Sequence, residues 1–162
     1  MNKKRLIAVF LIIAIFLIAW SIIEDQNKRI YRDYENDISS FQNVNKKLIE
    51  LLDNFIETPN IKNYSNIQYN MGILMENLIS LSRNMSECYK KGLLNVDKTY
   101  DEGRDISNTA ARIIQSSQNL IIESIKLSNS EIELSEDKVK TVYEELNSIN
   151  DLFKPYYNSL NW

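Results

Sequence analysis

The chain has 162 residues and a formal net charge of −3, and its three Gly and two Pro are too few for many short strands, which favours long helices. It has no His, which removes the commonest general base and metal ligand, and its single Cys excludes an intrachain disulfide. The negative charge disfavours a nucleic-acid binder, and frequent Asn, Ile, Lys and Tyr are typical of AT-rich genomes, which favours a bacterial or phage source.

Residues 6–23 form an apolar segment in which Ser21 is the only polar side chain. As a helix it spans about 27 Å, close to the roughly 30 Å hydrocarbon core of a bilayer. Trp20 lies near its distal edge, where an indole is favoured at the headgroup level. Because the segment is longer than the apolar region of a cleaved signal peptide, we predict a retained single-pass anchor in the cell membrane.

Residues 1–5 contain Lys3, Lys4 and Arg5, whereas all acidic residues lie at or after Glu24. A short basic tail before an apolar segment is typical of a signal-anchor whose N-terminus is cytoplasmic. We therefore predict that residues 1–5 are a cytoplasmic tail and that the rest of the chain beyond the anchor is extracytoplasmic.

Residues 24–155 are predicted to form a four-helix bundle. Thr58 precedes Pro59 and suits an N-cap with Pro at the first helical position, and Gly92 suits the C′ position of the helix before it. Ser130, with Glu133 three residues later, resembles a capping box. The predicted helices span about 24–57, 60–91, 96–128 and 132–154, and an aromatic tail, 156–162, follows.

Apolar residues recur at alternating three- and four-residue spacing in each segment, as in helices that pack around a shared seam. In the segment 96–128 one seam position is always small: Gly103, Ala110, Ser117, Ser124. The other, three residues later, is large: Ile106, Ile113, Leu120, Leu127. Small residues at this spacing let a neighbouring helix approach closely, and we expect the large ones to fill the centre.

The expected fold is therefore all-α, with the anchor helix continuing into an antiparallel up-down-up-down bundle. We identify no period-2 alternation that would indicate strands. An alternative joins the third and fourth segments into one helix, since neither Gly nor Pro separates them, but their seams do not continue in register across the link.

This topology places many aromatic residues at the end nearest the anchor. Of these, Tyr156, Tyr157 and Trp162, together with Trp20, are predicted membrane-interface residues, although rings there also suit a plug for the open end of the bundle. At the opposite end the candidate partner surface comprises Ile56, Ile61, Ile122 and Ile125. Core packing beneath the Pro59 turn is the alternative that we favour for these isoleucines.

Residues with catalytic potential are sparse. Asp97, Asp101 and Asp105 share a spacing that places them on one helix face, but acidic residues early in a helix also complement its dipole. Cys88 occupies a seam and suits a buried thiol, with an interchain disulfide as the alternative. Asn45 either specifies helix register or faces water. We predict no catalytic, cofactor or metal site and no enzyme.

Three functions remain open. The first is an interaction protein that assembles with other membrane or envelope proteins and could itself form homo-oligomers. The second is a ligand-sensing module, because the layout resembles the four-helix sensor domains of bacterial chemoreceptors, in which an anchor runs into an extracytoplasmic bundle. That resemblance is organisational and shares no motif, and this sequence shows no second membrane helix or signalling domain. The third is a phage or mobile-element envelope protein, such as a lysis or exclusion factor.

Overall fold

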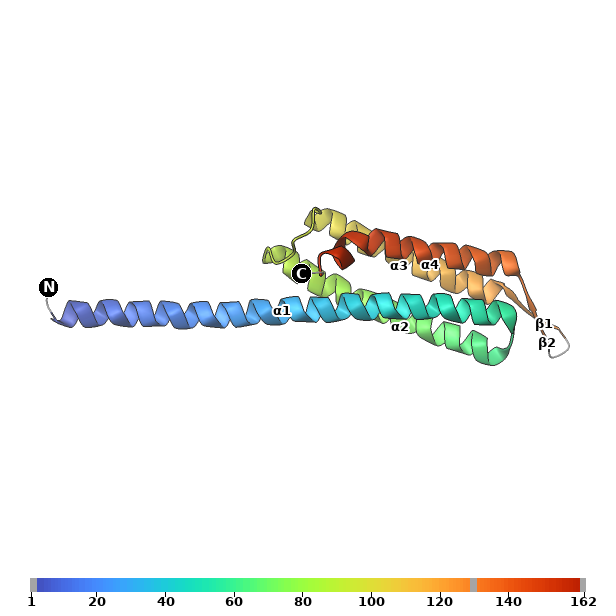
Figure 1. Ribbon diagram of the computed structural model, residues 1–162, viewed down its shortest axis with the longest axis horizontal. Helices are drawn as coiled ribbons and strands as arrows, with labels where there is room; N and C mark the ends of the chain where they lie inside the picture. Colours follow the sequence, from blue (N-terminus) through green and yellow to red (C-terminus); the bar gives the residue numbers. More distant parts are fainter. Residues whose placement is uncertain (1–2, 129–130, 161–162) are drawn as a thin grey trace.

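The structure is a computed structural model that describes the backbone of residues 3–128 and 131–160 and the side chains of residues 10–126 and 133–160. Four helices account for most of it, and a two-stranded hairpin lies between the last two (Figure 1). The elements are α1 (Lys3–Glu57), α2 (Ile61–Lys90), α3 (Tyr100–Glu123), β1 (Ile125–Ser128), β2 (Glu131–Leu134) and α4 (Glu136–Asn158).

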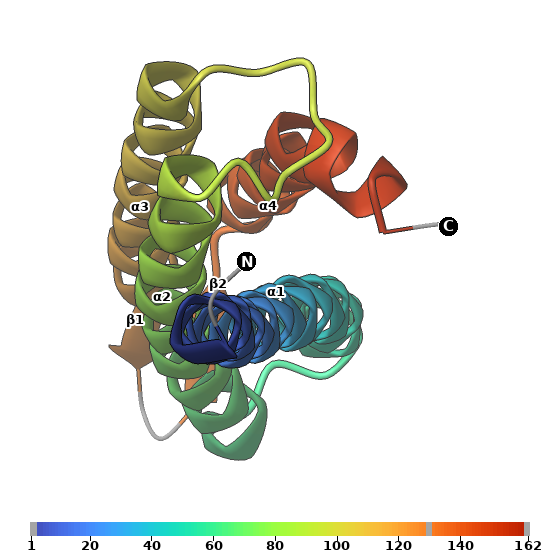
Figure 2. The same ribbon diagram turned by 90° about the vertical axis from the view of Figure 1, so that its left-hand side faces the viewer.

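Helix α1 is continuous over 55 residues, so the apolar segment and the first bundle helix are one element. Its N-terminal part projects from the bundle, whereas its C-terminal part packs against α2 and α4 (Figure 1). Helix α3 also packs against α2 and α4, which closes the four helices around one core (Figure 2). The prediction of four packed helices with a long apolar first helix is confirmed.

The two ends of the bundle differ. The α1–α2 connection and the β1–β2 hairpin form one end, which we call the hairpin end (Figure 1). The α2–α3 connection and the end of α4 form the other, from which α1 projects (Figure 1). We call this the tyrosine end, because Tyr31, Tyr34, Tyr89, Tyr156 and Tyr157 gather there.

Helix boundaries follow local hydrogen bonding. Asn60, rather than the expected Thr58, is the N-cap of α2, and its side chain accepts a 2.8 Å bond from the Asn63 N–H. Gly92 has φ +64 at the C′ position of α2, as predicted. The Leu93 N–H bonds to the Cys88 carbonyl at 2.9 Å and the Gly92 N–H to the Tyr89 carbonyl at 3.0 Å, which is a Schellman motif.

The expected helix 96–128 is shorter at both ends. Thr99 is the N-cap of α3 and forms a reciprocal capping box with Glu102, so the helix begins at Tyr100, four residues later than predicted. At the other end α3 stops at Glu123, and β1 pairs antiparallel with β2, with Ile125 opposite Leu134. The chain is therefore mainly but not entirely helical, and α3 and α4 are separate helices.

The hairpin also removes the predicted capping box at Ser130. Glu133 belongs to β2, Ser130 lies outside the described residues, and Ser135 is the N-cap of α4 without a capping side-chain bond. The segments Ile125–Ser128 and Glu131–Leu134 do alternate apolar and polar residues, so the expectation of no period-2 pattern is wrong. Four-residue strands are too short for this alternation to stand out beside helical seams.

The seams of α1, α2 and α4 are buried over most of their length, but Tyr31, Tyr64 and Ser135 are only half-buried and Ile132 belongs to β2. In α3 the buried positions are shifted by one residue from the predicted seam. The predicted residues Ile106, Ile113 and Leu120 are only half-buried, whereas the residues that follow them are buried, namely Ser107, Ile114 and Ile121. The central residue follows each small seam residue by four positions rather than three. The small residues themselves are buried, namely Gly103, Ala110, Ser117 and Ser124.

Candidate functional site

The projecting part of α1 is an exposed apolar rod. Its large apolar residues from Phe10 to Ile23 are between 49 % and 73 % exposed, and Trp20 is 69 % exposed. Helix α1 is long and apolar enough to cross a membrane. Among its described residues, none in the most apolar stretch is buried by the bundle. A core helix of a soluble protein would bury such a stretch, whereas a membrane anchor or a signal sequence would leave it exposed outside the bundle, as it is here.

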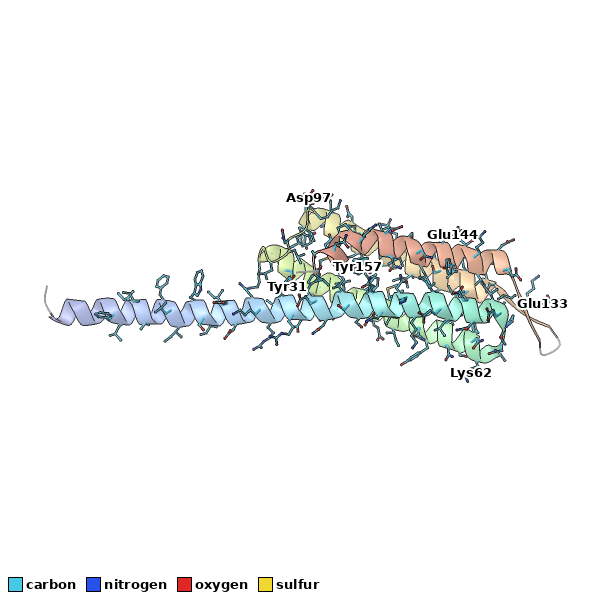
Figure 3. The ribbon with its side chains drawn as sticks, in the orientation of Figure 1. Tyr31, Lys62, Asp97, Glu133, Glu144 and Tyr157 are labelled. Atoms are coloured by element: carbon cyan, nitrogen blue, oxygen red, sulfur yellow. The ribbon has the colours of Figure 1, made fainter. Side chains whose placement is uncertain are left out.

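The tyrosine end is plugged by its own rings. Tyr34, Phe153 and Tyr156 are fully buried, and Phe153 contacts Phe41 with a ring-centroid distance of 5.1 Å. Tyr31 and Tyr157 lie at this end, opposite Lys62 and Glu133 at the hairpin end (Figure 3). Membrane contact was therefore wrongly predicted for Tyr156, which has no exposed surface, while Trp162 lies outside the described residues.

Tyr157 is half-buried, but its hydroxyl oxygen is inaccessible and has no hydrogen-bond partner in the described part of the chain. Burial raises the pKa of Tyr157 above its ordinary value. With its hydroxyl enclosed, Tyr157 has only the exposed part of its ring to offer a membrane, and its interface role stays a prediction.

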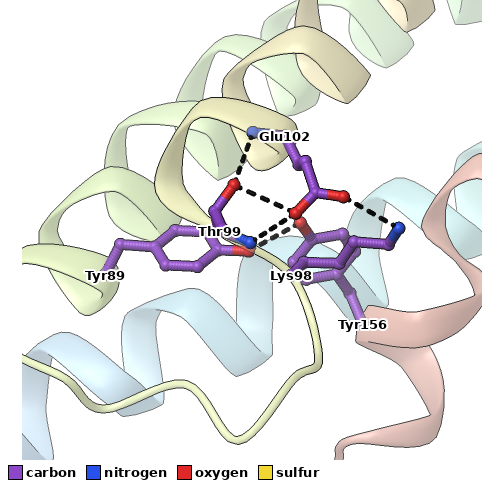
Figure 4. Close-up of polar contacts among 5 residues, drawn as sticks. All are labelled: Tyr89, Lys98, Thr99, Glu102 and Tyr156. Atoms are coloured by element: carbon purple, nitrogen blue, oxygen red, sulfur yellow. Dashed lines mark hydrogen bonds and ion pairs between the residues drawn. The ribbon is translucent and has the colours of Figure 1, made fainter.

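A small polar network joins α2, α3 and α4 at the same end. The Tyr89 and Tyr156 hydroxyls lie 2.8 Å apart beside the capping box of α3 (Figure 4). In that box the Thr99 N–H donates to Glu102 Oε2 at 2.8 Å, which holds the pKa of the Glu102 carboxyl below its usual value, and Lys98 pairs with Glu102 at 3.2 Å. This arrangement fixes the start of α3.

Gly103 makes that network possible. A Cβ at this position would lie 2.7 Å from Cε2 of Tyr89 and 3.1 Å from the Tyr156 hydroxyl. Real Cβ atoms essentially never show a contact of 2.7 Å, and 3.1 Å is tighter than most, so any other residue at this position would force the Tyr89 ring or the backbone of α3 to shift.

The hairpin end exposes isoleucines. Ile56 is 37 %, Ile61 65 % and Ile122 52 % exposed, and Ile125 is half-buried. The favoured expectation, that these residues fill the core beneath the Pro59 turn, is wrong for the first three. A groove of about 370 Å³ also opens between the end of α1 and the start of α4, lined by Asp53, Ile56, Glu136, Asp137, Lys140 and Tyr143.

A second groove, of about 350 Å³, lies between α2 and α3 near the tyrosine end, and Arg83, Ser86, Tyr100 and Arg104 are among its lining residues. Sequence reasoning missed it. The available signal was Ile79, Ser82, Arg83 and Ser86, whose spacing places them together on a face of α2 beside the seam.

The three aspartates do not form one helix face as expected. Asp97 precedes α3, and within the helix Asp101 pairs with Arg104 at 3.1 Å. Among the described residues no group of three His, Cys, Asp or Glu side chains is placed to hold a metal ion.

Other polar residues join helices. The Asn45 Nδ2 donates to the Leu146 carbonyl at 2.9 Å and to Asn150 Oδ1 at 3.0 Å, so Asn45 is buried against α4 and does not face water. Asp37 Oδ2 of α1 accepts bonds from Ser80 and Asn84 of α2 at 2.7 and 2.8 Å. Both arrangements specify how neighbouring helices align.

No protein-family model matches this chain, and neither a curated protein nor a solved structure is significantly similar to it. Its function is therefore argued from its own residues.

Proposed function

We propose that the chain is a single-pass membrane protein that serves as an interaction component of a membrane or envelope assembly. In this proposal residues 6–23 are a retained anchor, the N-terminus is cytoplasmic, and the extracytoplasmic part is an up-down-up-down four-helix bundle. Its partners are other membrane or envelope proteins, and it has no enzymatic activity of its own.

One observation carries the proposal. Large apolar side chains are exposed in two places, on the projecting part of α1 and at the hairpin end, whereas the core of the bundle between them is buried. Leu17 and Ile18 are 65 % and 62 % exposed on the projecting part, and Ile61 is 65 % exposed at the hairpin end. Water does not favour such surfaces, so a bilayer suits the first and a protein partner suits the second.

The hairpin end has the chemistry of a protein contact. Ile56 and Tyr143 lie in a groove whose charged lining residues are three carboxylates and one ammonium group, so an apolar centre adjoins a mainly acidic rim: Asp53, Glu136, Asp137 and Lys140. Protein interfaces commonly combine an apolar core with a polar rim. A partner that presents an apolar side chain flanked by Lys or Arg would complement this groove.

The anchor needs its own test, because a cleaved signal peptide would share its length and position. Ala19 and Ser21 are small residues two positions apart, which is the spacing that signal peptidase uses. Intact-mass measurement of the chain extracted from membranes should show residues 1–21 retained. A mass that begins at Ile22 would refute the anchor.

Partner contact is tested by placing a photo-crosslinking amino acid at Ile122 in the full-length chain in its native cell. Gln115, an exposed polar position on the same helix, is the matched control. The proposal expects discrete crosslinked species from Ile122 that are absent from Gln115, and their loss when Ile61 is replaced by Ser. Identical patterns at both positions, or none at Ile122, would contradict it.

A further inference from the structure

The groove between α2 and α3 carries a positive charge that the bundle only partly neutralises. Arg83 and Arg104 both line it, and no Asp or Glu is among its lining residues. In the described part of the chain Arg83 has no ion pair or hydrogen bond to another side chain. The ion pair of Arg104 with Asp101 is weak, because these side chains are 57 % and 74 % exposed.

Hydroxyl groups and an apolar wall complete the groove. Ser82 and Ser86 lie on the α2 side, and Ser86 Oγ donates to the Tyr100 hydroxyl at 3.3 Å. Tyr100 is 41 % exposed and meets the Tyr89 ring edge-on, with centroids 6.1 Å apart. Ile79, 56 % exposed, extends the apolar side along α2.

We propose that this groove binds a small amphipathic anion, namely a carboxylate or phosphate ester that carries an aromatic or aliphatic group. A guanidinium binds both oxygens of such a group through paired N–H donors, and serine hydroxyls supply further donors. The apolar part of the ligand would cover Ile79 and Tyr100. A volume of about 350 Å³ suits a ligand of this size.

The position of the groove distinguishes a soluble anion from a lipid headgroup, if α1 is the proposed anchor. The α2 residue Cys88, next to Tyr89, is level with Ile30, since its Sγ lies 3.9 Å from the Ile30 carbonyl. Ile30 is about 10 Å along the helix beyond Ile23, whereas the headgroup region extends roughly 5–7 Å beyond the hydrocarbon core.

The other side of the groove lies farther from the membrane. Asn84, next to Arg83, bonds to Asp37, which is about 21 Å beyond Ile23. The groove therefore opens above the headgroups, and a soluble anion is the occupant that we propose. This inference extends beyond the proposed function, because it assigns a ligand site at a different place from the partner surface.

The test uses the full-length chain in phosphatidylcholine nanodiscs, with phenyl phosphate as the probe and calorimetry as the measurement. We expect saturable binding that is stronger than for inorganic phosphate. Arg83→Gln and Arg104→Gln should each weaken it by about tenfold, as expected for loss of a charge-assisted hydrogen bond. Lys91→Gln, an exposed residue outside the groove, should leave affinity unchanged.

Circular dichroism of each variant shows whether the helices are intact, and Ile79→Ala provides a second variant that removes no charge. It should weaken phenyl phosphate but not inorganic phosphate. No saturable binding, or equal binding by the Arg83→Gln variant, would overturn the proposal. If phosphatidylglycerol in the nanodisc competes with phenyl phosphate, the proposal of a soluble anion is overturned and the groove is assigned to a lipid headgroup.

Discussion

Gly103 of α3 lies against the ring of Tyr89 of α2 so closely that a Cβ on Gly103 would come within 2.7 Å of Tyr89 Cε2. The ring has little freedom to move away, because its hydroxyl bonds to the Tyr156 hydroxyl and the ring packs perpendicular to that of Tyr100. The contact sets the spacing of three helices at the tyrosine end and places Arg104 beside α2.

Replacing Gly103 by Ala should therefore lower the free energy of unfolding by about 1 kcal/mol. Ala favours a helix over Gly by about 1 kcal/mol, but overpacking costs roughly 1–3 kcal/mol, so the clash outweighs the propensity. Urea titration of the full chain in detergent, followed by helical circular dichroism, measures the change.

Gly72→Ala is the matched control, because Gly72 is also helical and a Cβ there meets nothing within 4 Å. It should raise the free energy of unfolding by about 0.5–1 kcal/mol. Stabilisation of both variants would show that Tyr89 is not held in place.

The neighbouring tyrosines Tyr156 and Tyr157 should respond in opposite directions to loss of their hydroxyls. Tyr156→Phe leaves the Tyr89 hydroxyl without its partner and should cost about 0.5–1.5 kcal/mol of unfolding free energy. Tyr157→Phe removes a buried hydroxyl that has no partner in the described residues, so it should be neutral or stabilising by up to about 1 kcal/mol. A loss of stability in Tyr157→Phe equal to that in Tyr156→Phe would contradict this assignment.

The same burial predicts weakening in alkali. Burial raises the pKa of Tyr156 and Tyr157, so the folded state favours the neutral phenols. Their contribution is complete below the unfolded pKa of about 10 and is lost as pH rises above it, by up to about 1.4 kcal/mol per pH unit for each group. Urea titrations between pH 8 and pH 11 should show this fall, and Tyr157→Phe should make it shallower. Equal slopes for both proteins would refute the burial of this hydroxyl.

The predicted seams were correct wherever one apolar period runs without competition. In α2 every seam residue from Ile67 to Cys88 is buried, because the 3–4 spacing leaves one apolar face. In α3 small and large residues both repeat every seven positions, so the residue three or four positions after each small one could face the centre of the bundle. The structure buries Ser107 rather than Ile106, and this choice depends on how α3 packs against α2 and α4, which the repeat alone does not specify.

The hairpin and the grooves show a different limit of sequence reasoning. Ile125 and Leu134 are paired by the hairpin, and their short alternation resembles the end of one helix and the start of another. Arg83 and Arg104 are 21 positions apart and line the same groove only because α2 and α3 pack side by side. Exposure at Ile61 and Ile122 likewise depends on which faces the neighbouring helices cover.

Asn45 should tolerate no negative charge. Its Nδ2 donates to the Leu146 carbonyl, and Asn45→Asp would direct a buried carboxylate at that oxygen without changing the side-chain volume. An uncompensated buried charge costs about 3–5 kcal/mol, so we expect a loss of this size at pH 7 in urea titration. Asn43→Asp, at an exposed position two residues away, should change stability by less than about 0.5 kcal/mol. Similar effects at both positions would show that Asn45 is not enclosed by α4.

The Cys88 thiol should be unreactive in the folded protein. It is fully buried, and burial raises the pKa of its thiol to about 11. Because the thiolate is the nucleophile, alkylation by iodoacetamide at pH 8 should be slower than that of an exposed thiol by at least about 100-fold. Ser39→Cys in a Cys88→Ala background supplies that exposed thiol on α1. Urea should bring the two rates together, and non-reducing gels of the native chain should show no interchain disulfide. A disulfide-linked dimer formed without denaturant would show instead that the α1–α2 interface opens around Cys88.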